Sequence, residues 1–313
     1  MSSPSQQLAV QSGIYVLMTA AHNEEAFIEG TIESVLAQTV RPQRWVIVSD
    51  NSNDRTDEIV EKYAGQHDFI RFLRLSRAPG HSFGAKVTAL QKGSRLLEDV
   101  EYEFIGNLDA DVSLDASYFE SLIGCFRKDP ELGLVGGFVC EKLGEEYRSR
   151  AVNDTRNVAH AAQLVRRECY EAIGGYKVLK YGGEDWYAQT QARMLRWHVE
   201  SVPELKIFHH RHTGGGSSWA RSALRLGRLD YSFGSDPIFE IMKCLRRVGE
   251  KPYLAAALTR LAGFAWPYVC RERREVPEDF VAFLRQEQRE RLSALLTPAR
   301  PEPAAAPRPL GEK

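Results

Sequence analysis

Two aspartates, Asp109 and Asp111, follow directly after an apolar segment at residues 102–108. That segment is apolar enough to form a buried strand, so the two acids stand where the strand would leave its sheet. In open α/β sheets, ligands gather at the carboxyl ends of the strands. Two carboxylates one residue apart can converge on one cation, and their oxygens suit Mg²⁺ or Mn²⁺, which would neutralise a diphosphate. From the spacing alone, a turn with two solvated aspartates is an equally good interpretation.

The segments that must position this pair alternate between strand and helix. Short apolar runs predict strands at residues 14–20, 45–48, 69–75 and 102–108. Such alternation is typical of a mostly parallel sheet with helices on both faces. Parallel strands would bring Asp50, which ends the second strand, to the same edge of the sheet as Asp109 and Asp111.

The helices between these strands are predicted from apolar residues at helical spacing. The first is expected to begin at Glu24 under a cap from Asn23 or His22, and the second under a cap from Asp54. A third is expected at residues 85–97, after a glycine-containing loop.

The second half of the chain is predicted to be less regular. Strands are expected at residues 134–140, 161–166 and 206–208, and helices at 117–126, 167–173 and, after a glycine-containing turn, up to about Arg196. From residue 217 to 296 the pattern is helical throughout. Residues 1–12 and the Pro- and Ala-rich residues 297–313 are expected to be disordered. The chain therefore divides into a globular unit at 13–216 and a helical region at 217–296.

The composition of the chain excludes several classes of protein. Of its 313 residues 43% are hydrophobic and 27% charged, as in ordinary globular proteins. A net charge of −1 gives no reason to expect a nucleic acid partner. The five cysteines are scattered and form no CxxC pair, which favours neither a zinc site nor a disulfide framework and suits the cytoplasm. We also expect no secretory signal and no membrane span, because no sufficiently long apolar run occurs.

Four motifs occur in an order that carries a family resemblance. They are Ala21-His22-Asn23-Glu24-Glu25, the segment from Val48 to Thr56, Asp109-Ala110-Asp111, and Gly182-Gly183-Glu184-Asp185-Trp186. With these motifs the chain resembles the inverting family 2 glycosyltransferases of the GT-A fold over residues 14–212. The resemblance implies that residues 13–216 form a GT-A catalytic domain and that residues 217–296 are a C-terminal helical extension. The chain departs from the family pattern at position 22, usually Tyr, and at position 49, often Asp.

The resemblance implies a donor site for a nucleotide sugar. Asp50 would accept a hydrogen bond from the nucleotide base, since an ionised carboxylate is purely an acceptor. A cation, Lys86 or Arg77, would approach the diphosphate, although each could equally be a solvated surface charge. The remaining donor-binding residues expected from the motifs are Ala20, His22, Glu24, Asp109, Ala110 and Asp111.

The same resemblance implies a divalent cation, Mg or Mn, in the donor site. Asp111 would bind it directly, and Asp109 would contact it or the ribose. A histidine after the strand at 206–208 closes the metal site in some members of the family, and imidazole is a good Mn²⁺ ligand. His209 matches that position best, with His210 as the alternative.

The fourth motif implies the catalytic base and the acceptor side. Asp185 is expected to take the proton from the acceptor hydroxyl as it attacks the anomeric carbon. Glu184 would orient the acceptor or the loop, and Trp186 would stack on an acceptor sugar. The structural alternatives are a pair of acids that caps a helix and a tryptophan that packs in the core.

The helical region carries a local excess of positive charge. Between Ser217 and Arg274 there are eleven Lys and Arg residues against five Asp and Glu, among them Arg246 and Arg247. A basic amphipathic region can lie on an anionic membrane surface, which would suit a lipid-linked acceptor and a peripheral location on the inner face of the membrane. The alternative is a helical subdomain with solvated arginines, which is the commoner use of a charged face.

The family resemblance implies an inverting glycosyltransferase of the hexosyltransferase type. It would move a sugar from a nucleotide-diphosphate donor, UDP rather than GDP, to a hydroxyl on a glycan or lipid-linked acceptor in cell-envelope or exopolysaccharide synthesis. The enzymatic alternative is a sugar-nucleotide nucleotidyltransferase, which would want a basic, glycine-rich loop after the first strand. The other is a catalytically silent nucleotide-sugar-binding scaffold, and a dehydrogenase is disfavoured because no GxGxxG follows the first strand. The sequence leaves open the sugar, the acceptor, the linkage and the oligomeric state.

Overall fold

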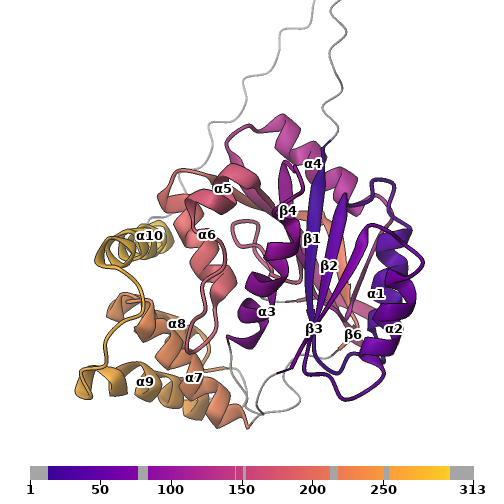
Figure 1. The fold of residues 1–313 in the computed structure, drawn as a ribbon. Helices are drawn as coiled ribbons and strands as arrows, with labels where there is room; N and C mark the ends of the chain where they lie inside the picture. The colour runs from indigo at the N-terminus through magenta and orange to yellow at the C-terminus, as the bar shows by residue number, and fades with distance from the viewer. Residues whose placement is uncertain are drawn as a thin grey trace, which may run out of the picture.

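The computed structural model describes residues 13–76, 84–144, 146–150, 153–211, 218–249 and 254–296. Figure 1 shows a twisted sheet with helices on both of its faces and, to one side, a group of C-terminal helices. The predicted α/β class with a helical C-terminal region is therefore confirmed. The predicted disordered ends, at 1–12 and 297–313, lie outside the described residues.

The first half of the chain forms a parallel layer of strands, as the alternation predicts. Its elements are β1 (Tyr15–Ala21), α1 (Ile28–Leu36), β2 (Arg44–Asp50), α2 (Thr56–Ala64), β3 (Ile70–Leu75), α3 (Ala85–Ser94), a short 3₁₀ turn (Arg95–Leu97) and β4 (Phe104–Leu108). β1 pairs in parallel with both β2 and β4, and β2 pairs in parallel with β3. Their carboxyl ends consequently meet at one edge of the sheet.

The second half adds antiparallel strands to the sheet, but β6 and β9 pair in parallel with each other and run in the same direction as β1 to β4. Its elements are β5 (Val112–Leu114), α4 (Tyr118–Lys128), β6 (Leu132–Leu143), β7 (Glu146–Ser149), β8 (Ala162–Arg166), α5 (Arg167–Ala172), α6 (Glu184–Met194) and β9 (His198–His209). Among the described residues the strand order is β3-β2-β1-β4-β8-β6-β9-β5, with β7 on β6. β8 runs antiparallel to both β4 and β6. The short β5, which the sequence does not predict, pairs antiparallel with β9 and places Val112 opposite His209.

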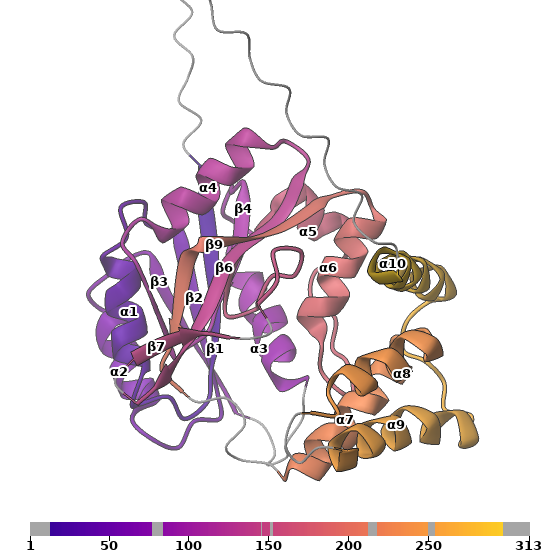
Figure 2. The ribbon, with the colours of Figure 1, turned by 180° about the vertical axis from the view of Figure 1, so that it is seen from behind.

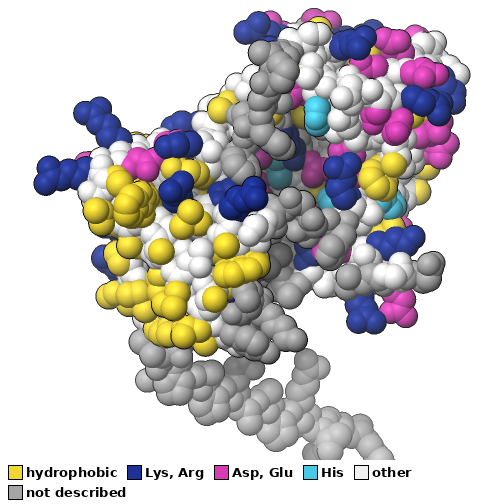
Figure 3. Space-filling model, turned by 90° about the horizontal axis from the view of Figure 1, so that it is seen from below, with side chains coloured by type: hydrophobic (Ala, Val, Ile, Leu, Met, Phe, Trp, Pro, Cys, Tyr) yellow, Lys and Arg dark blue, Asp and Glu magenta, His cyan; other side chains and the backbone are white. Residues whose placement is uncertain are grey.

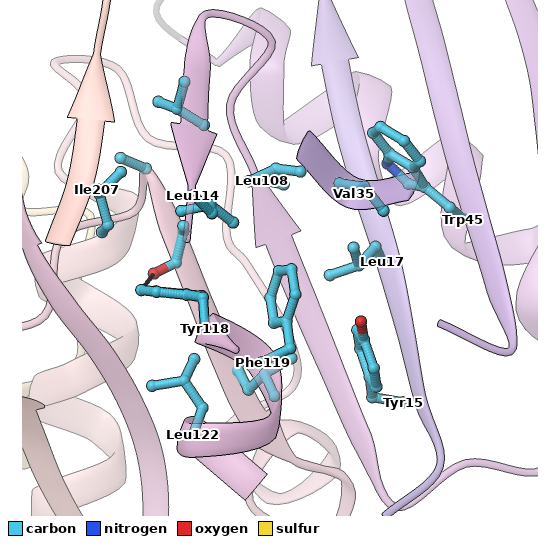
Figure 4. Close-up of a cluster of buried hydrophobic side chains, with 14 of the residues drawn as sticks. Tyr15, Leu17, Val35, Trp45, Leu108, Leu114, Tyr118, Phe119, Leu122 and Ile207 are labelled. Carbon is cyan, nitrogen blue, oxygen red and sulfur yellow. Dashed lines mark hydrogen bonds between the residues drawn. The ribbon is translucent and has the colours of Figure 1, made fainter. Parts of the chain in front are cut away.

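The strand residues divide the hydrophobic core into two layers by simple alternation. Tyr15 and Leu17 of β1 face the layer covered by α1, α2 and α4, whereas Val16 and Met18 face the layer covered by α3, α5 and α6. Figure 2 shows the sheet from its other side, with α1 and α2 on the side away from α6. Figure 4 shows how side chains from β1, α4 and β9 meet in the first layer, where the Tyr15 and Phe119 rings stack with centroids 4.9 Å apart. Both layers are buried, which gives the carboxyl edge a rigid support.

The first helix begins later than the sequence predicts. α1 starts at Ile28, and neither Asn23 nor His22 caps it. Asn23 instead adopts a positive φ of 56°, and its side-chain oxygen accepts a hydrogen bond from the Asn53 amide at 2.9 Å. Asp54 does accept hydrogen bonds from the backbone and hydroxyl of Thr56, the first residue of α2. The polar residues after β1 therefore join two loops rather than extend a helix.

The C-terminal helices are α7 (Trp219–Ser232), α8 (Pro237–Arg246), α9 (Leu254–Val269) and α10 (Glu278–Leu296). α7 and α9 cross closely where two glycines meet: a Cβ on Gly227 would lie 2.0 Å from the Arg260 carbonyl oxygen. A small apolar cluster that includes Tyr187, Phe233 and Phe280 joins this group to α6. Among the described helices, none combines the length and apolar character needed to span a lipid bilayer.

Two of the eleven Lys and Arg residues counted in the helical region, Arg260 and Arg225, make contacts inside the protein. Arg260 is buried and pairs with Asp230 and with Glu240, the latter at 2.8 Å. Arg225 donates a hydrogen bond to the Tyr181 carbonyl at 2.8 Å, which ties α7 to the turn before α6. Helix packing turned these side chains inward, and periodicity alone could not separate them from the solvated arginines.

Candidate active site

Two predicted acids and one predicted histidine meet at the carboxyl edge of the sheet. One ligand atom each from Asp109, Asp111 and His209 lies within 4.8 Å of the others. The antiparallel pairing of β5 with β9 explains the approach, because it brings the start of β5 against the end of β9. Two carboxylates and an imidazole form a donor set that suits Mg²⁺ or Mn²⁺.

The hydrogen bonds of the two histidines distinguish them as ligands. His209 Nδ1 lies 2.5 Å from the Arg211 carbonyl oxygen, so this nitrogen carries the proton and Nε2 keeps its lone pair. That Nε2 faces Asp111 Oδ1 at 3.5 Å. His210 uses both ring nitrogens, with the Tyr147 hydroxyl at 2.7 Å and the Ser113 hydroxyl at 3.0 Å. Of the two alternatives that the sequence leaves open, His209 therefore has the free ligand atom.

Lys86, the predicted diphosphate-binding cation, lies beside the acidic cluster. Its Nζ is 2.5 Å from Asp109 Oδ1. Burial lowers the pKa of Lys86, but the carboxylates of Asp109, Glu184 and Asp185 outweigh it and the net shift is upward. Lys86 is therefore charged and acts on both groups of acids. Arg77, the alternative cation, lies outside the described residues.

A second cation, Arg211, borders the cluster on the other side. Its guanidinium pairs with Glu24 and reaches Asp111 Oδ2 at 3.6 Å. Burial and the nearby Asp111 carboxylate raise the pKa of Glu24 to about 7, against the opposing effect of Arg211. Burial also raises the pKa of Asp111, which His209 partly offsets. This crowding of acids is the electrostatic condition that a bound cation would relieve.

The pocket predicted for the nucleotide base is built from two segments, one after β1 and one after β2, that are joined by hydrogen bonds. The Glu24 amide donates to the Thr56 hydroxyl at 2.7 Å, and the Asn23 amide donates to the Ser52 hydroxyl at 3.1 Å. His22 Nδ1 lies 2.7 Å from the Asp50 carbonyl oxygen, and the Asp50 side chain is buried. Thus Asp50 and His22 lie together, with Ala20 at the end of the neighbouring strand β1.

The backbone of Ala110, between the two acids, is hydrogen-bonded to helix α1. Its carbonyl oxygen accepts a hydrogen bond from the Thr31 hydroxyl at 2.8 Å, and the same hydroxyl lies 2.8 Å from the Val112 carbonyl oxygen. Thr31 is buried in α1, so this contact anchors the acidic turn to the helix beneath it. The positions of Asp109 and Asp111 therefore depend on α1 as well as on β4.

Asp185, the predicted general base, lies in the first turn of α6. The preceding glycines have positive φ values of 82° and 86°, and a Cβ on Gly183 would lie 3.0 Å from the Phe233 ring, so both conformation and space favour glycine there. Burial and the neighbouring Glu184 raise the pKa of Asp185 to about 6. A carboxyl group with this pKa is ionised at neutral pH and yet more basic than an ordinary aspartate.

Glu184 and Trp186 flank this aspartate in different surroundings. Glu184 Oε1 lies 3.9 Å from Nδ1 of the buried His160, and neither ring nitrogen of His160 has a hydrogen-bond partner among the described residues. Trp186 packs edge-on against Phe233, with ring centroids 4.6 Å apart, and is partly buried. Trp186 thus has the packing contact that was the alternative to a role in acceptor binding. It also lines a cavity.

Arg211 and His160 are not predicted as site residues from the sequence. Arg211 carries one signal, its place directly after the predicted ligand His209. His160 lies in no motif. It precedes β8, and the pairing of β8 with β4 brings it close to Asp109. The His160 carbonyl oxygen accepts a hydrogen bond from the side-chain amide of Asn107, two residues before Asp109.

Comparison with known proteins decides the family. A model of glycosyl transferase family 2 matches residues 17–180, which include β1 to α5 and the acidic cluster except His209. The chain belongs to glycosyl transferase family 2. This is the family that the four motifs predict, and the match does not support the nucleotidyltransferase alternative.

A curated relative and two solved structures are similar to this chain, the relative in sequence and the structures in fold. Poly-beta-1,6-N-acetyl-D-glucosamine synthase of Staphylococcus aureus is 36% identical over 127 residues, which is 40% of this chain and 28% of that enzyme. The structure of GalNAc-T7 with UDP, GalNAc and Mn²⁺ has a TM-score of 0.58 at 15% identity, covering 92% of this chain and 58% of that one. Mannosyltransferase PcManGT from Pyrobaculum calidifontis, with GDP-Man and Mn²⁺, has a TM-score of 0.52 at 18% identity, covering 90% and 78%. These structural likenesses establish the GT-A fold.

Proposed function

We propose that this glycosyltransferase moves a sugar from a nucleotide-diphosphate donor, UDP rather than GDP, to a hydroxyl group, with inversion at the anomeric carbon. The observation that carries the proposal is the Asp109–Asp111–His209 cluster, joined through Lys86 to the acids at the start of α6. The acceptor is a glycan or a lipid-linked sugar in cell-envelope or exopolysaccharide synthesis. The polysaccharide that the Staphylococcus aureus relative is named for supports that context, although the aligned segment spans only 28% of that enzyme.

On the donor side, three groups of residues divide the work. Asp109, Asp111 and His209 would hold a divalent cation, Mg or Mn, which when bound stabilises negative charge on the departing diphosphate. Asp50 accepts a hydrogen bond from the base, in the pocket formed with Ala20, His22 and the loop at Glu24. Lys86 offers its ammonium group to the diphosphate while it stays near Asp109.

On the acceptor side, Asp185 takes the proton from the attacking hydroxyl. Its pKa of about 6 leaves it ionised at neutral pH, and its half-buried position keeps bulk water from competing for it. Glu184 holds the adjacent position between Lys86 and His160 and orients the acceptor. The glycines before them set the backbone direction that aims both carboxylates.

A binding panel tests the donor half of this proposal. Calorimetry with UDP, GDP, CMP and NAD, each with Mn²⁺ and with EDTA, would be run on the wild type, Asp111→Asn, His209→Ala and His210→Ala. We expect UDP to bind with Mn²⁺ and to bind at least about tenfold more weakly to the first two variants. His210→Ala is the matched control, because both of its nitrogens are engaged elsewhere. Binding that ignores the metal and Asp111 would remove the proposed ligand roles.

Product analysis separates the two rival functions. A sugar-nucleotide synthase would release pyrophosphate from a nucleoside triphosphate and a sugar phosphate, whereas a glycosyltransferase releases a nucleoside diphosphate from the sugar nucleotide. A catalytically silent scaffold would bind the nucleotide and release neither product. Release of UDP from a UDP-sugar in the presence of a glycan acceptor, absent in Asp185→Asn, is the result that the proposal requires.

The proposal includes peripheral contact of the C-terminal helices with an anionic membrane surface. Ile238, Ile241, Met242 and Leu245 of α8 are between 41% and 66% exposed and share one face of the helix, since their spacing is i, i+3, i+4 and i+7. α9 likewise exposes Leu254, Leu258, Trp266 and Val269. Figure 3 shows hydrophobic side chains gathered on this part of the molecule, with Lys and Arg side chains around them. Exposed apolar surface bordered by cations matches the boundary of an anionic bilayer.

The placement of this face agrees with a lipid-linked acceptor. In Figure 1 the carboxyl ends of β1, β2 and β3 and the helices α7 and α9 lie at the bottom of the molecule, and Figure 3 looks onto that side. The exposed side chains of Arg246, Arg271 and Arg273 supply the positive charge near the apolar face. Contact of the C-terminal helices with a membrane would bring the carboxyl edge of the sheet, where the candidate site lies, toward the membrane surface that carries a lipid-linked acceptor.

Vesicle flotation tests this contact. We expect the wild type to float with vesicles of phosphatidylglycerol and phosphatidylcholine and less with phosphatidylcholine alone. Ile241→Ser with Leu245→Ser, and Arg246→Ala with Arg247→Ala, should each reduce flotation. Leu96→Ser is the control, because Leu96 is an exposed apolar residue of the 3₁₀ turn after α3, next to β2. No flotation of the wild type, or a stable dimer in solution that the serine variant dissolves, would overturn the membrane contact.

A further inference from the structure

A cavity of about 560 Å³ lies between the part of the molecule that contains the sheet and the C-terminal helices α7 to α10. We call it the junction cavity. Its wall includes Asp185 and Trp186 from α6, and it also includes side chains from each of the helices α7 to α10. Cavities of this size hold small-molecule ligands. Because the proposed base forms part of its wall, a ligand in the junction cavity would lie next to the reacting hydroxyl.

The wall is rich in cations, and most of them are already neutralised by the protein. Four basic residues line the cavity: Arg150, Lys243, Arg260 and Arg291. Arg260 pairs with Asp230 and Glu240, and Lys243 Nζ lies 2.8 Å from Asp230 Oδ1 and 3.4 Å from Glu240 Oε2. Arg150 pairs with Glu141 at 2.6 Å.

Arg291 of α10 differs from these three residues. No ion pair or hydrogen bond joins its side chain to another described residue, and its Nε is buried without a partner. Two acids, Glu287 and Asp154, act on the charge of Arg291, but Glu287 is engaged by Arg193 at 2.8 Å, and Arg193 and Arg156 add opposing positive charge. A half-buried guanidinium with no ion-pair partner among the described residues is costly, so this part of the cavity wall can accept an anion.

We propose that the junction cavity binds an acceptor saccharide that carries an anionic group, a phosphate or a carboxylate, and that Arg291 pairs with that group. The inference rests on the proposed function, since it names the class of acceptor that Asp185 deprotonates. A guanidinium matches either anion through paired hydrogen bonds. The rest of the wall suits the sugar itself, because Trp186 and Phe239 offer apolar faces and Ser201 offers a hydroxyl group.

The experiment compares three soluble probes: glucose, glucuronic acid and glucose 6-phosphate. Their binding would be measured by saturation-transfer NMR and calorimetry on the wild type, Arg291→Ala, Arg291→Lys and Arg289→Ala. Arg289 is the matched control, because it lies on the same helix and is 68% exposed in an ion pair with Asp236. UDP binding with Mn²⁺ would be measured on each variant, as would the melting temperature.

We expect an anionic probe to bind more tightly than glucose to the wild type and to lose about tenfold in affinity in Arg291→Ala. Arg291→Lys should recover part of the loss, and Arg289→Ala should lose nothing. Preference for glucose 6-phosphate identifies a phosphate and preference for glucuronic acid a carboxylate, and either supports the inference. Equal binding of all three probes, or equal affinities in Arg291→Ala and the wild type, overturns it. Retained UDP binding in the same samples would show that this failure leaves the donor proposal intact, whereas absent UDP binding in the wild type would remove the proposed function itself.

Discussion

The ammonium nitrogen of Lys86 lies 2.5 Å from the Oδ1 atom of Asp109. This contact connects the two halves of the site, because the charge of Lys86 also acts on Asp185 at the start of α6. Lys86 sits in the first turn of α3, which packs against β1 and β2 in the second core layer. A single side chain thus stands between the proposed metal ligands and the proposed base.

Replacement of Lys86 should weaken donor binding more than it weakens the fold. In Lys86→Met we expect UDP to bind about tenfold or more weakly with Mn²⁺, since a charge-assisted contact to the diphosphate would be lost. Calorimetry gives the affinity. Lys92→Met is the matched control, because Lys92 is an exposed lysine of the same helix. Equal losses in the two variants would argue against a specific role for Lys86.

Asp185→Asn should remove transfer and stabilise the protein. The folded state holds the pKa of Asp185 at about 6, above the ordinary 3.8, so at neutral pH its ionised form costs the folded state free energy that the unfolded chain does not pay. An amide removes that cost, and we expect a gain on the order of 1–3 kcal/mol in the free energy of unfolding at pH 7. Denaturant unfolding and a transfer assay measure the two effects. A variant that stays active, or that is destabilised at pH 7, would contradict the assignment.

The rate of transfer should depend on pH through the same carboxyl group. A general base must be ionised, so kcat/KM should fall as the pH drops below about 6 and approach a tenfold loss per unit. Rates between pH 4.5 and 8 at a saturating metal concentration would show this limb. UDP binding must be measured over the same range, because the pKa of Glu24, beside the acidic cluster, is about 7. A fall in rate that simply follows donor binding would take the limb away from Asp185.

Arg260→Met should destabilise the C-terminal helices strongly. The buried Arg260 pairs with Asp230 and Glu240, and its loss leaves these two buried acids with Lys243 as their one remaining cationic partner among the described residues. Removal of one partner from a buried ion pair costs about 3–5 kcal/mol. Burial already raises the pKa of Glu240, so this carboxylate can take up a proton as the pH falls, and the loss should be smaller at pH 5 than at pH 8.

The control for this variant is Arg289→Met. Arg289 pairs with Asp236 but is 68% exposed, and such pairs contribute about 1 kcal/mol or less. Urea unfolding of both variants at the two pH values provides the comparison. Similar losses in the two variants would mean that the buried network contributes no more than a surface ion pair.

The sequence was most informative where local pattern and burial agree. The parallel strands β1 to β4 were predictable because their apolar runs are buried on both faces and the intervening segments have helical spacing. The start of α1 was not predictable, because Asn23 and Glu24 find partners in the loop after β2 and at the start of α2, not in a helix of their own. Short strands such as β5 carry too few residues for a period and are held by pairing with a distant segment.

By itself, the sequence determined the residue types and their order: two acids after a buried strand, a glycine pair before two more acids, and histidines after a late strand. Tertiary structure decided which of these side chains meet. Pairing of β5 with β9 and the hydrogen bonds of each imidazole selected His209 rather than His210, because only His209 keeps a free nitrogen facing Asp111. Helix packing likewise buried Arg260 and left Arg291 without an ion-pair partner among the described residues. Such outcomes depend on contacts between residues far apart in the chain, and the spacing within any one segment carries no record of them.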